Sequence, residues 1–229
     1  MEVSKSKEEI AEKRIQYSIH EQIQTNNKTS YLFFKRAIDI LGSIFGIIIL
    51  SPLFLMVSLL IKIEDSKGPV IFKQKRIGKD ETSFYMYKFR SMVSNAEELK
   101  EKLIEQNEAT GPVFKIKEDP RVTRIGRFIR RTSIDELPQL FNVLKGEMTL
   151  VGPRPPLVDE VKEYTSYERQ RLSVRPGLTC YWQVSGRSNL SFEEWVRLDL
   201  QYIKNRSFWL DMKLILRTFL VLFGSKDAY

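Results

Sequence analysis

The longest apolar stretch of the chain is the feature that most restricts its fold. From Ile40 to Ile61 the sequence runs for 22 residues without a charge. A straight helix of that length would span roughly 33 Å, which is enough to cross the hydrocarbon core of a bilayer. We therefore expect a membrane helix over about residues 36–62 rather than a buried core helix.

The pair Ser51-Pro52 lies at the middle of this run. A proline removes a backbone hydrogen bond and kinks a helix. Basic residues flank both ends of the run, so the positive-inside rule gives no clear orientation. A helix that enters one leaflet, breaks at Ser51-Pro52 and returns to the same face fits both observations. A helix that crosses the bilayer with a tolerated proline fits nearly as well, and the residues alone leave the two open.

Charge and composition exclude several classes of chemistry. The net charge is +8, and residues 62–229 carry +7 of it. A basic globular part implies an anionic partner such as phosphate, anionic lipid headgroups or nucleic acid. The single histidine, His20, lies in the polar N-terminal segment, and Cys180 is the only cysteine. Multi-ligand His/Cys zinc sites and Ser-His or Cys-His nucleophile systems are therefore ruled out for the folded part.

Two adjacent carboxylates, Asp135 and Glu136, follow seven basic residues in the segment 115–131. Because proline fits only the first turn of a helix, Pro138 predicts a helix that begins close to Asp135 and continues to Leu144. Carboxylates at the positive end of a helix stay ionised, and they suit binding of a cation or nucleophilic attack. Capping is the plainer alternative, because Ser133 and Glu136 fit the S-x-x-E capping box.

A β-hairpin is predicted from two runs rich in β-branched and aromatic residues, 68–78 and 82–92, with a turn between them. Lys88 and Arg90 would share one face of the second strand, as a solvated basic face or as phosphate contacts. Further along, two prolines bracket Arg154 and hold its backbone extended. A guanidinium presented in this way suits bidentate recognition of phosphate or carboxylate.

The other predicted elements are a scaffold helix, a basic amphipathic helix, a strand with a turn, a helix that carries Asp199, and an apolar C-terminal helix. The last of these could lie along a membrane surface or pack in a core. In chain order they cover about residues 93–108, 121–130, 178–187, 191–204 and 208–223.

Six motifs then follow one another in a fixed order: KRAIDI…SP, GPVIFKQKRIG, YKFRSM, DPRVTRIGRFIRRTSIDELPQLFNVLKGEMTLVGPRP, RPGLTCYWQVSGR and LDLQYI. Together they resemble the bacterial sugar transferase family, the monotopic phosphoglycosyl transferases, from about Tyr31 to the end of the chain. The resemblance implies an α+β, helix-rich fold. It would comprise a polar tail over 1–30 and one membrane-associated catalytic domain over 31–229. The family anchor is a re-entrant helix with a Ser-Pro break, which favours re-entry at Ser51-Pro52. With only 30 polar residues in front, we expect the minimal form of the family.

The reaction implied by the resemblance is transfer of a sugar-1-phosphate from a UDP-sugar to polyprenyl (undecaprenyl) phosphate, with release of UMP. It would take place among the lipids of the bacterial inner membrane, on the cytoplasmic face, and would begin assembly of a surface glycan or exopolysaccharide. No nucleic-acid partner is expected, a homodimer is left open, and the identity of the sugar is not indicated.

Residue by residue, the resemblance implies that Asp135 is the nucleophile of a ping-pong mechanism through a glycosyl-phosphoryl aspartate. Glu136, with Asp135, would hold Mg²⁺. The remaining matched positions are the phosphate-binding residues Arg154, Lys88 and Arg130 and the active-site acid Asp199. Cys180 stands where the family often has glycine, in a region linked to the choice of sugar or nucleotide.

Two other classes of function compete with this interpretation. A non-catalytic membrane adaptor would use the basic face to hold anionic lipid, and it would be indifferent to Mg²⁺. A nucleic-acid binder is disfavoured by the uncharged run and by the lack of any nucleic-acid module. Neither alternative explains adjacent carboxylates beside a proline-bracketed arginine.

Overall fold

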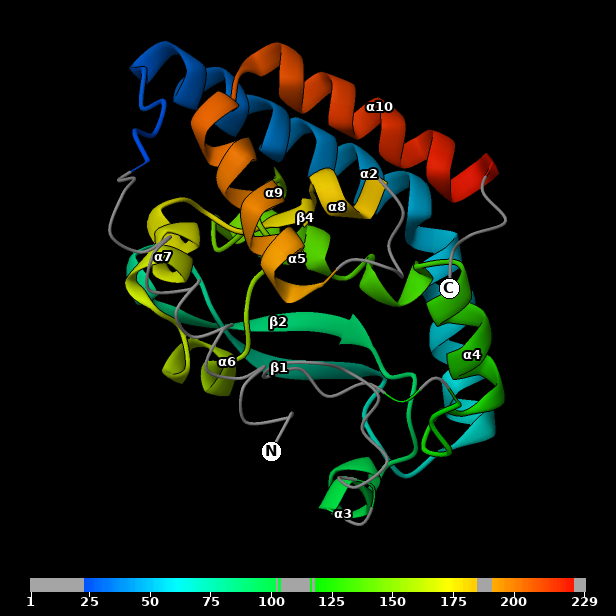
Figure 1. The fold of residues 1–229 in the computed structure, drawn as a ribbon. Coiled ribbons are helices and arrows are strands. Elements are labelled where there is room, and N and C mark those ends of the chain that lie inside the picture. The colour runs from blue at the N-terminus through cyan, green and yellow to red at the C-terminus, as the bar shows by residue number, and fades with distance from the viewer. Residues whose placement is uncertain (1–22, 102, 104–115, 117, 185–190, 225–229) are drawn as a thin grey trace, which may run out of the picture.

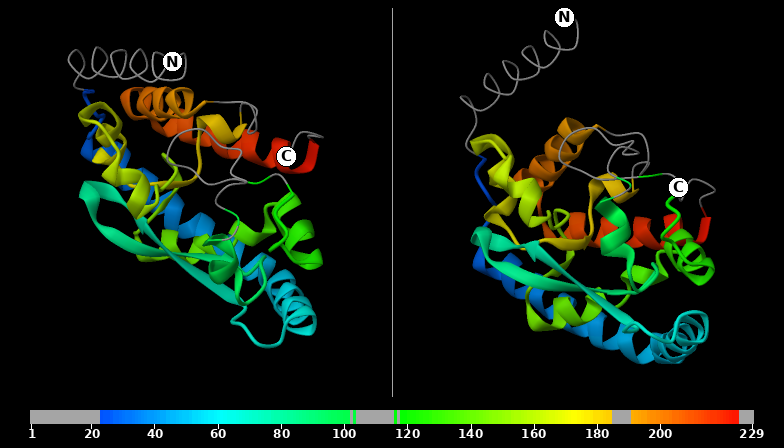
Figure 2. Two further views of the ribbon diagram at one scale, coloured as in Figure 1. Left: turned by 60° about the horizontal axis from the view of Figure 1, so that its bottom comes forward. Right: turned by 90° about the horizontal axis from the view of Figure 1, so that it is seen from below.

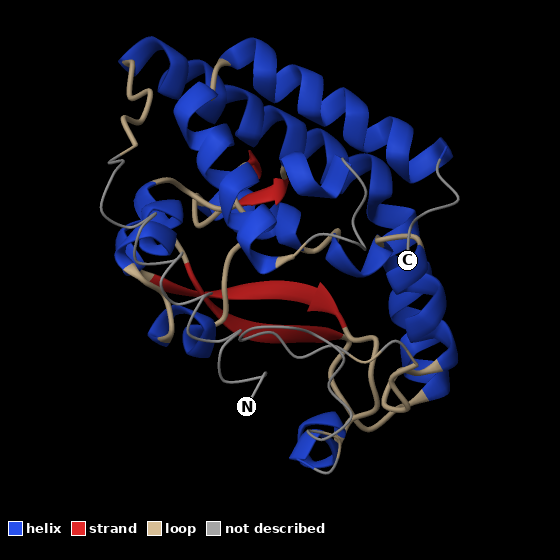
Figure 3. Cartoon of the chain, in the orientation of Figure 1, coloured by secondary structure: helices blue, strands red, loops and turns tan. Residues whose placement is uncertain are grey.

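The structure is a computed structural model that describes residues 23–101, 103, 116, 118–184 and 191–224. Figure 1 shows the hairpin β1–β2 below a group of short elements, with α10 and the first part of α2 above them. The second part of α2 descends along the right side beside α4, and α3 lies lowest. Figure 3 shows that helices predominate, which confirms a helix-rich α+β fold.

The helices are α2 Thr29–Glu64, α3 Ala96–Glu101, α4 Arg124–Arg131, α5 Gln139–Lys145, α6 Val158–Lys162, α7 Ser166–Arg169, α8 Tyr181–Val184, α9 Phe192–Asn205 and α10 Phe208–Gly224. The strands are β1 Ile71–Ile77, β2 Ser83–Phe89, β3 Thr149–Val151 and β4 Gly177–Thr179, and the 3₁₀ turns are η1 Lys79–Glu81, η3 Ile134–Glu136 and η4 Gln170–Ser173.

Helix α2 is longer than predicted and is not interrupted at the proline, which lies inside it. Figure 1 shows that the helix changes direction partway along its length. Pro52 has no N–H to donate to the carbonyl of Ile48, and the Ser51 hydroxyl donates to that carbonyl instead, at 2.8 Å. The Ser-Pro pair therefore bends the helix while the freed carbonyl keeps a hydrogen bond, so the predicted break is a bend in a continuous helix.

Helix α2 packs against α4, α5, β3 and α10 along one side and leaves many of its apolar side chains exposed. Only five of its residues are buried, and it is the one described helix long and apolar enough to cross a membrane, with 11% of its most apolar window buried. Helix α10 contacts α2, and Figure 2 shows the two helices running in the same direction. The large apolar side chains exposed on these two helices include Phe33, Phe45, Ile48, Leu55, Leu59, Ile63, Trp209, Leu216 and Leu220.

The predicted hairpin is confirmed. Strands β1 and β2 pair antiparallel, with Phe72 opposite Lys88 and Arg76 opposite Phe84. Because side chains alternate across a strand, Arg76, Phe84 and Lys88 lie on one face of the hairpin. Phe84 and Met86 pack on this face against Val143 of α5 and Met148, so the hairpin forms the floor beneath α5.

Asn142 fixes α5 over that floor. Its side chain is fully buried, it accepts from the N–H of Tyr87 at 3.0 Å, and it donates to the carbonyl of Tyr85 at 2.7 Å. One amide side chain thus takes the hydrogen bonds that a third strand would make along β2. Since η3 immediately precedes α5, this contact also sets the height of η3 above the hairpin.

Several predicted boundaries differ from the structure. The helix expected over 93–108 is described only over Ala96–Glu101, and residues 104–115 lie outside the described part. The strand expected from 178 is the short β4, followed by a helical turn, α8, and the turn near 186 is also outside the described part. The helices predicted over 191–204 and 208–223 are confirmed as α9 and α10.

Of the predicted tail, residues 1–22 are outside the described part, and residues 23–28 are tied to the domain. The N–H of Ile23 donates to Gln170 at 2.8 Å, and Arg206 donates to the Asn26 carbonyl at 3.0 Å. The end of this segment therefore packs against η4 and the C-terminus of α9 before α2 begins.

Candidate active site

The two carboxylates lie in the irregular segment between α4 and α5. Asp135 and Glu136 belong to the 3₁₀ turn η3, and regular helix begins only at Gln139. Ser133 precedes the turn in a left-handed conformation (φ 55°) and makes no side-chain cap bond. The predicted helix start at Asp135 is therefore wrong by four residues, and the predicted capping box does not form. Pro138 occupies the N-cap position of α5 rather than its first turn.

Lys88 and Arg130 come to this turn from two other elements. Lys88 Nζ lies 2.8 Å from Glu136 Oε1, and both side chains are part-buried. Arg130, at the end of α4, donates from Nε to the Ser91 hydroxyl at 2.8 Å. Helix α4 packs close here because Gly126 has no side chain: a Cβ would lie 1.9 Å from the carbonyl oxygen of Ser91.

The charge of Asp135 is strongly affected by its surroundings. The carboxyl is 8% exposed, and burial raises its pKa to about 6. Glu136 adds to the increase, while Lys88 and Arg130 oppose it. Asp135 therefore ionises less readily than an exposed aspartate, because burial outweighs the neighbouring positive charges, although at neutral pH the carboxylate form still prevails. The turn nonetheless brings four of the predicted site residues together.

Arg154 is held at the edge of this group by a carboxylate and a ring. Its Nη1 lies 3.8 Å from Glu160 Oε1, and its guanidinium lies over the Trp195 ring at 5.7 Å from the centroid. Its side chain is 26% exposed, so part of the guanidinium faces solvent. The prediction that this arginine is presented from a fixed backbone is supported by the backbone bond from Gly177 N–H to the Pro153 carbonyl at 2.8 Å.

Asp199 is the predicted site residue whose placement differs most from expectation. It is fully buried in α9 and accepts from Arg171 at 2.9 and 2.6 Å. Arg171 in turn donates to the hydroxyl of Tyr164 at 2.8 Å. Burial raises the pKa of Asp199 even though Arg171 lowers it. These contacts assign Asp199 to a buried ion pair behind Arg154, with no bond to η3 among the described residues.

Comparison with known proteins identifies the family. The family described as Bacterial sugar transferase matches residues 30–225. The chain belongs to this family. It is 49% identical over 222 residues to the galactosyl transferase CpsE of Streptococcus agalactiae, and 44% identical over 217 residues to the undecaprenyl-phosphate galactose phosphotransferase of Salmonella typhimurium.

These two sugar transferases are longer proteins. Their matches cover 94% and 91% of this chain but 49% and 44% of the relatives, so the chain spans about half the length of these curated relatives. The exopolysaccharide production protein ExoY of Sinorhizobium fredii is 39% identical over 199 residues, and this match covers 85% of the chain and 88% of ExoY.

Sequence reasoning missed Arg76. Arg76 is 6% exposed, donates to the Gln74 side chain at 3.1 and 2.6 Å, and donates to the Pro155 carbonyl at 2.9 Å. Burial, followed by repulsion from Arg154, lowers its pKa to about 9. The sequence contained a signal for it: in the register of the hairpin, Arg76 in β1 falls on the same face of the hairpin as Lys88 in β2. Arg76 thus joins the hairpin floor to the Arg154 loop.

The residues of η3 fit a Mg²⁺ ion that also binds a phosphate. Proteins commonly hold Mg²⁺ with one or two carboxylates, together with substrate phosphates and waters. Asp135 and Glu136 supply two such groups. The pKa of Asp135 is raised by burial even though the positive charge of Lys88 lowers it, so the ionised carboxylate would gain from a further cation. No cluster of three or more His, Cys, Asp or Glu side chains suited to a metal occurs among the described residues. A metal ion at η3 would therefore take its remaining ligands from phosphate or water.

Proposed function

We propose that this protein transfers a sugar-1-phosphate from a UDP-sugar to polyprenyl phosphate, with release of UMP, at the cytoplasmic face of a bacterial inner membrane. The observation that carries the proposal is the buried Asp135, with Glu136 beside it and the cations Lys88 and Arg130 acting on its charge. Two relatives add support through their names: the undecaprenyl-phosphate galactose phosphotransferase of Salmonella typhimurium and the undecaprenyl-phosphate glucose phosphotransferase of Komagataeibacter xylinus, which is 43% identical over 210 residues.

The proposed mechanism uses Asp135 as a covalent nucleophile. A carboxylate oxygen of Asp135 attacks the sugar-bearing β-phosphorus, the bond from that phosphorus to the bridging oxygen breaks, and UMP leaves with the electron pair. An oxygen of polyprenyl phosphate then attacks the same phosphorus. The bond to Asp135 breaks, the carboxylate is regenerated, and the sugar remains on a polyprenyl diphosphate.

Both steps bring one anion to another, so the site must supply positive charge. Lys88 and Arg130 lie on the η3 side of the site and Arg154 at its edge, which suits them to hold phosphate oxygens. Bound Mg²⁺, held by Asp135 and Glu136, would neutralise phosphate charge. Arg76 keeps the loop of Arg154 in register with the hairpin through the Pro155 carbonyl.

The same proposal includes a re-entrant anchor. Helix α2 exposes large apolar side chains along most of its length and bends near Ser51-Pro52. A bent apolar helix that enters one leaflet would bury these side chains in lipid. The two ends of the helix would then lie on one side of the membrane, together with the site.

The reaction is tested with detergent-purified protein, Mg²⁺, undecaprenyl phosphate and a panel of UDP-sugars, by following UMP release. We expect release from one or a few sugars, abolished in Asp135→Asn and without Mg²⁺. Asp159→Asn is the matched control, because Asp159 is 85% exposed and pairs with an exposed lysine. Turnover by Asp135→Asn at the wild-type rate would contradict the covalent mechanism. Silence across the whole panel by folded protein would favour the membrane-adaptor alternative.

The anchor is tested separately by labelling cysteines. Ser30 in the first turn of α2 and Ser66 just after its end are exposed, whereas the native Cys180 is buried. An impermeant maleimide should label Ser30→Cys and Ser66→Cys from the same, cytoplasmic side. Labelling of the two positions from opposite sides would show a helix that crosses the bilayer.

A further inference from the structure

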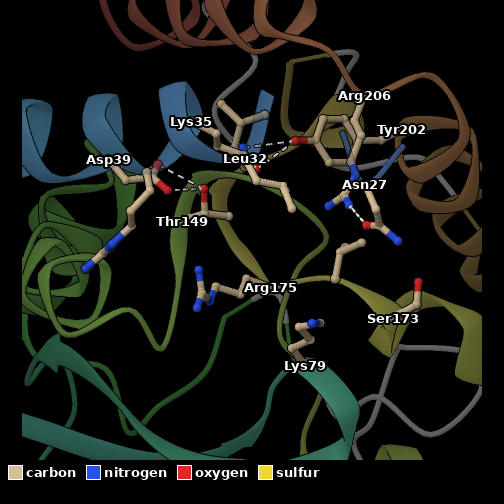
Figure 4. A pocket seen from close by; sticks show the side chains of 13 residues that line it. Asn27, Leu32, Lys35, Asp39, Lys79, Thr149, Ser173, Arg175, Tyr202 and Arg206 are labelled. Carbon is tan, nitrogen blue, oxygen red and sulfur yellow. Dashed lines mark hydrogen bonds between the residues drawn. The ribbon is translucent and has the colours of Figure 1, made fainter. Parts of the chain in front are cut away.

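A second group of basic side chains surrounds a cavity away from η3. The cavity has a volume of about 190 Å³ and lies between the start of α2, the hairpin turn η1 and the segment 173–175 (Figure 4). None of its lining residues is Asp135, Glu136, Lys88, Arg130 or Arg154. Its basic lining residues are Lys35, Arg36, Lys79, Arg175 and Arg206, and Asp39 is its only acidic one.

The one acidic group of the lining is outnumbered by five basic residues, and its hydrogen bonds come from neutral donors. Asp39 is 4% exposed, and it accepts from the Thr149 hydroxyl at 2.8 and 2.9 Å and from the Leu150 N–H at 2.8 Å. Lys35 has its own acidic partner outside the lining, Asp211, at 2.8 Å. These two lining residues are therefore already satisfied by the protein.

The other cations keep their charge. Arg36 donates to the carbonyls of Val143 and Leu144 at 2.7 and 2.8 Å, and Arg206 donates to Asn26 and Asn27 at 3.0 and 2.6 Å. Neutral acceptors orient a guanidinium without cancelling its charge. A concave surface that carries one sign of charge concentrates the field and attracts counter-ions.

Arg175 is the side chain best placed to bind such an ion. It is exposed, and no hydrogen bond or ion pair of its side chain occurs within the described part of the chain. Its backbone is fixed: the next residue, Pro176, accepts from Thr149 N–H at 2.8 Å, and a Cβ on Gly152 would lie 2.6 Å from the Arg175 carbonyl oxygen. Figure 4 shows Arg175 and Lys79 on the hairpin side of the cavity, opposite Lys35 and Asp39.

We propose that this cavity binds the phosphate group of an anionic ligand, at a site separate from the Asp135 pair. The guanidinium of Arg175 offers a planar fork that matches phosphate oxygens. Lys79, which lies 3.4 Å from the exposed Asp80, adds a second positive charge. The phosphate has two possible sources. One is the headgroup of an anionic phospholipid, since Leu32 in the lining and the neighbouring Phe33 are exposed apolar residues. The other is a soluble phosphate or diphosphate. The inference does not depend on the proposed reaction.

The experiment compares the full chain with three variants. Arg175→Gln removes the fork, Arg197→Gln removes an exposed arginine of α9 that does not line the cavity, and Arg154→Gln weakens the phosphate contacts proposed near η3. One arm titrates pyrophosphate into detergent-purified protein by calorimetry. The other arm counts phosphatidylglycerol molecules retained by protein released from nanodiscs of phosphatidylglycerol and phosphatidylcholine, by native mass spectrometry.

Loss of one charge-assisted contact should weaken binding by about tenfold or more in Arg175→Gln, while Arg197→Gln and Arg154→Gln keep the cavity site. A loss confined to the pyrophosphate arm identifies a soluble ligand, and a loss confined to the lipid arm identifies a headgroup. The proposal is overturned if Arg175→Gln binds both ligands as the wild type does. It is also overturned if Arg197→Gln loses as much binding as Arg175→Gln. Should Arg175→Gln fail to fold, Lys79→Gln, at an exposed position, provides the same comparison.

Discussion

Replacing Asp135 by asparagine should stabilise the protein while removing its proposed nucleophile. Burial raises the pKa of this carboxyl from its ordinary 3.8 to about 6. Because the folded-state pKa is the higher one, the folded protein favours the protonated carboxyl. Stability is therefore lost as the pH rises from about 4 to about 6 and the group ionises. At about 1.4 kcal/mol per pH unit, the ionised carboxylate costs about 3 kcal/mol at pH 7.5.

Asparagine has nearly the same shape and no charge to bury. Allowing for hydrogen bonds that the amide replaces imperfectly, we expect Asp135→Asn to raise the free energy of unfolding by about 1–3 kcal/mol at pH 7.5. For a chain of this size, that corresponds to an increase in Tm of about 2–10 °C. The measurement is thermal unfolding followed by tryptophan fluorescence, in detergent and without Mg²⁺.

The pH dependence separates burial of charge from a general effect of the substitution. At pH 5 the wild-type carboxyl is mostly protonated, so the difference in Tm should shrink. The exposed Asp159→Asn should change stability by less than about 0.5 kcal/mol at either pH. If Asp135→Asn melts at or below the wild-type temperature at pH 7.5, or if its advantage is the same at pH 5, the buried charge is not the cause. A variant that is more stable and inactive also cannot owe its inactivity to misfolding.

Three further predictions follow from single contacts. Arg171→Met leaves the fully buried Asp199 without its partner and should lower the free energy of unfolding by about 3–5 kcal/mol; a loss below about 1 kcal/mol in chemical unfolding would refute the pairing. Arg76→Lys keeps the charge but loses the planar fork that holds the Pro155 carbonyl, so UMP release should fall by about tenfold or more in protein with unchanged secondary structure by circular dichroism. Pro52→Ala restores a backbone N–H and should straighten α2, which would move the labelling of Ser66→Cys to the opposite side of the membrane.

The local elements of this fold were largely predictable, because each has a pattern in its own residues. The hairpin has two runs rich in β-branched and aromatic residues with a turn between them, and α9 has a capping serine at Ser191 with Glu194 three residues later. Helix α10 is strongly apolar, with only Asp211, Lys213 and Arg217 charged. In α2, the Ser51-Pro52 pair marked the position of the bend, but not that the serine hydroxyl would keep the helix continuous.

The candidate site was less predictable, because it is assembled from contacts distant in sequence. Asp135 and Lys88 were found from their motifs, but the burial that raises the pKa of Asp135 depends on packing that no local pattern encodes. Asp199 was expected in the site, and the sequence did not indicate that it would be fully buried and paired with Arg171. Arg76 was overlooked because a lone arginine in a strand resembles any solvated residue until the hairpin register is applied.

The buried and exposed arginines of this fold differ in the partners that they have. Arg171 and Arg90 each donate to a carboxylate, so their charge is cancelled within the fold. Arg76 donates to the Gln74 amide oxygen and to the Pro155 carbonyl, while the charges of Glu160 and Glu136 also act on it. The Arg175 side chain has no partner among the described residues, so its charge is available to an anion. Burying a guanidinium whose hydrogen bonds go to neutral acceptors costs stability. That cost is consistent with a role of Arg76 in placing the Arg154 loop, and a count of basic residues in the sequence cannot show which of them are held in this way.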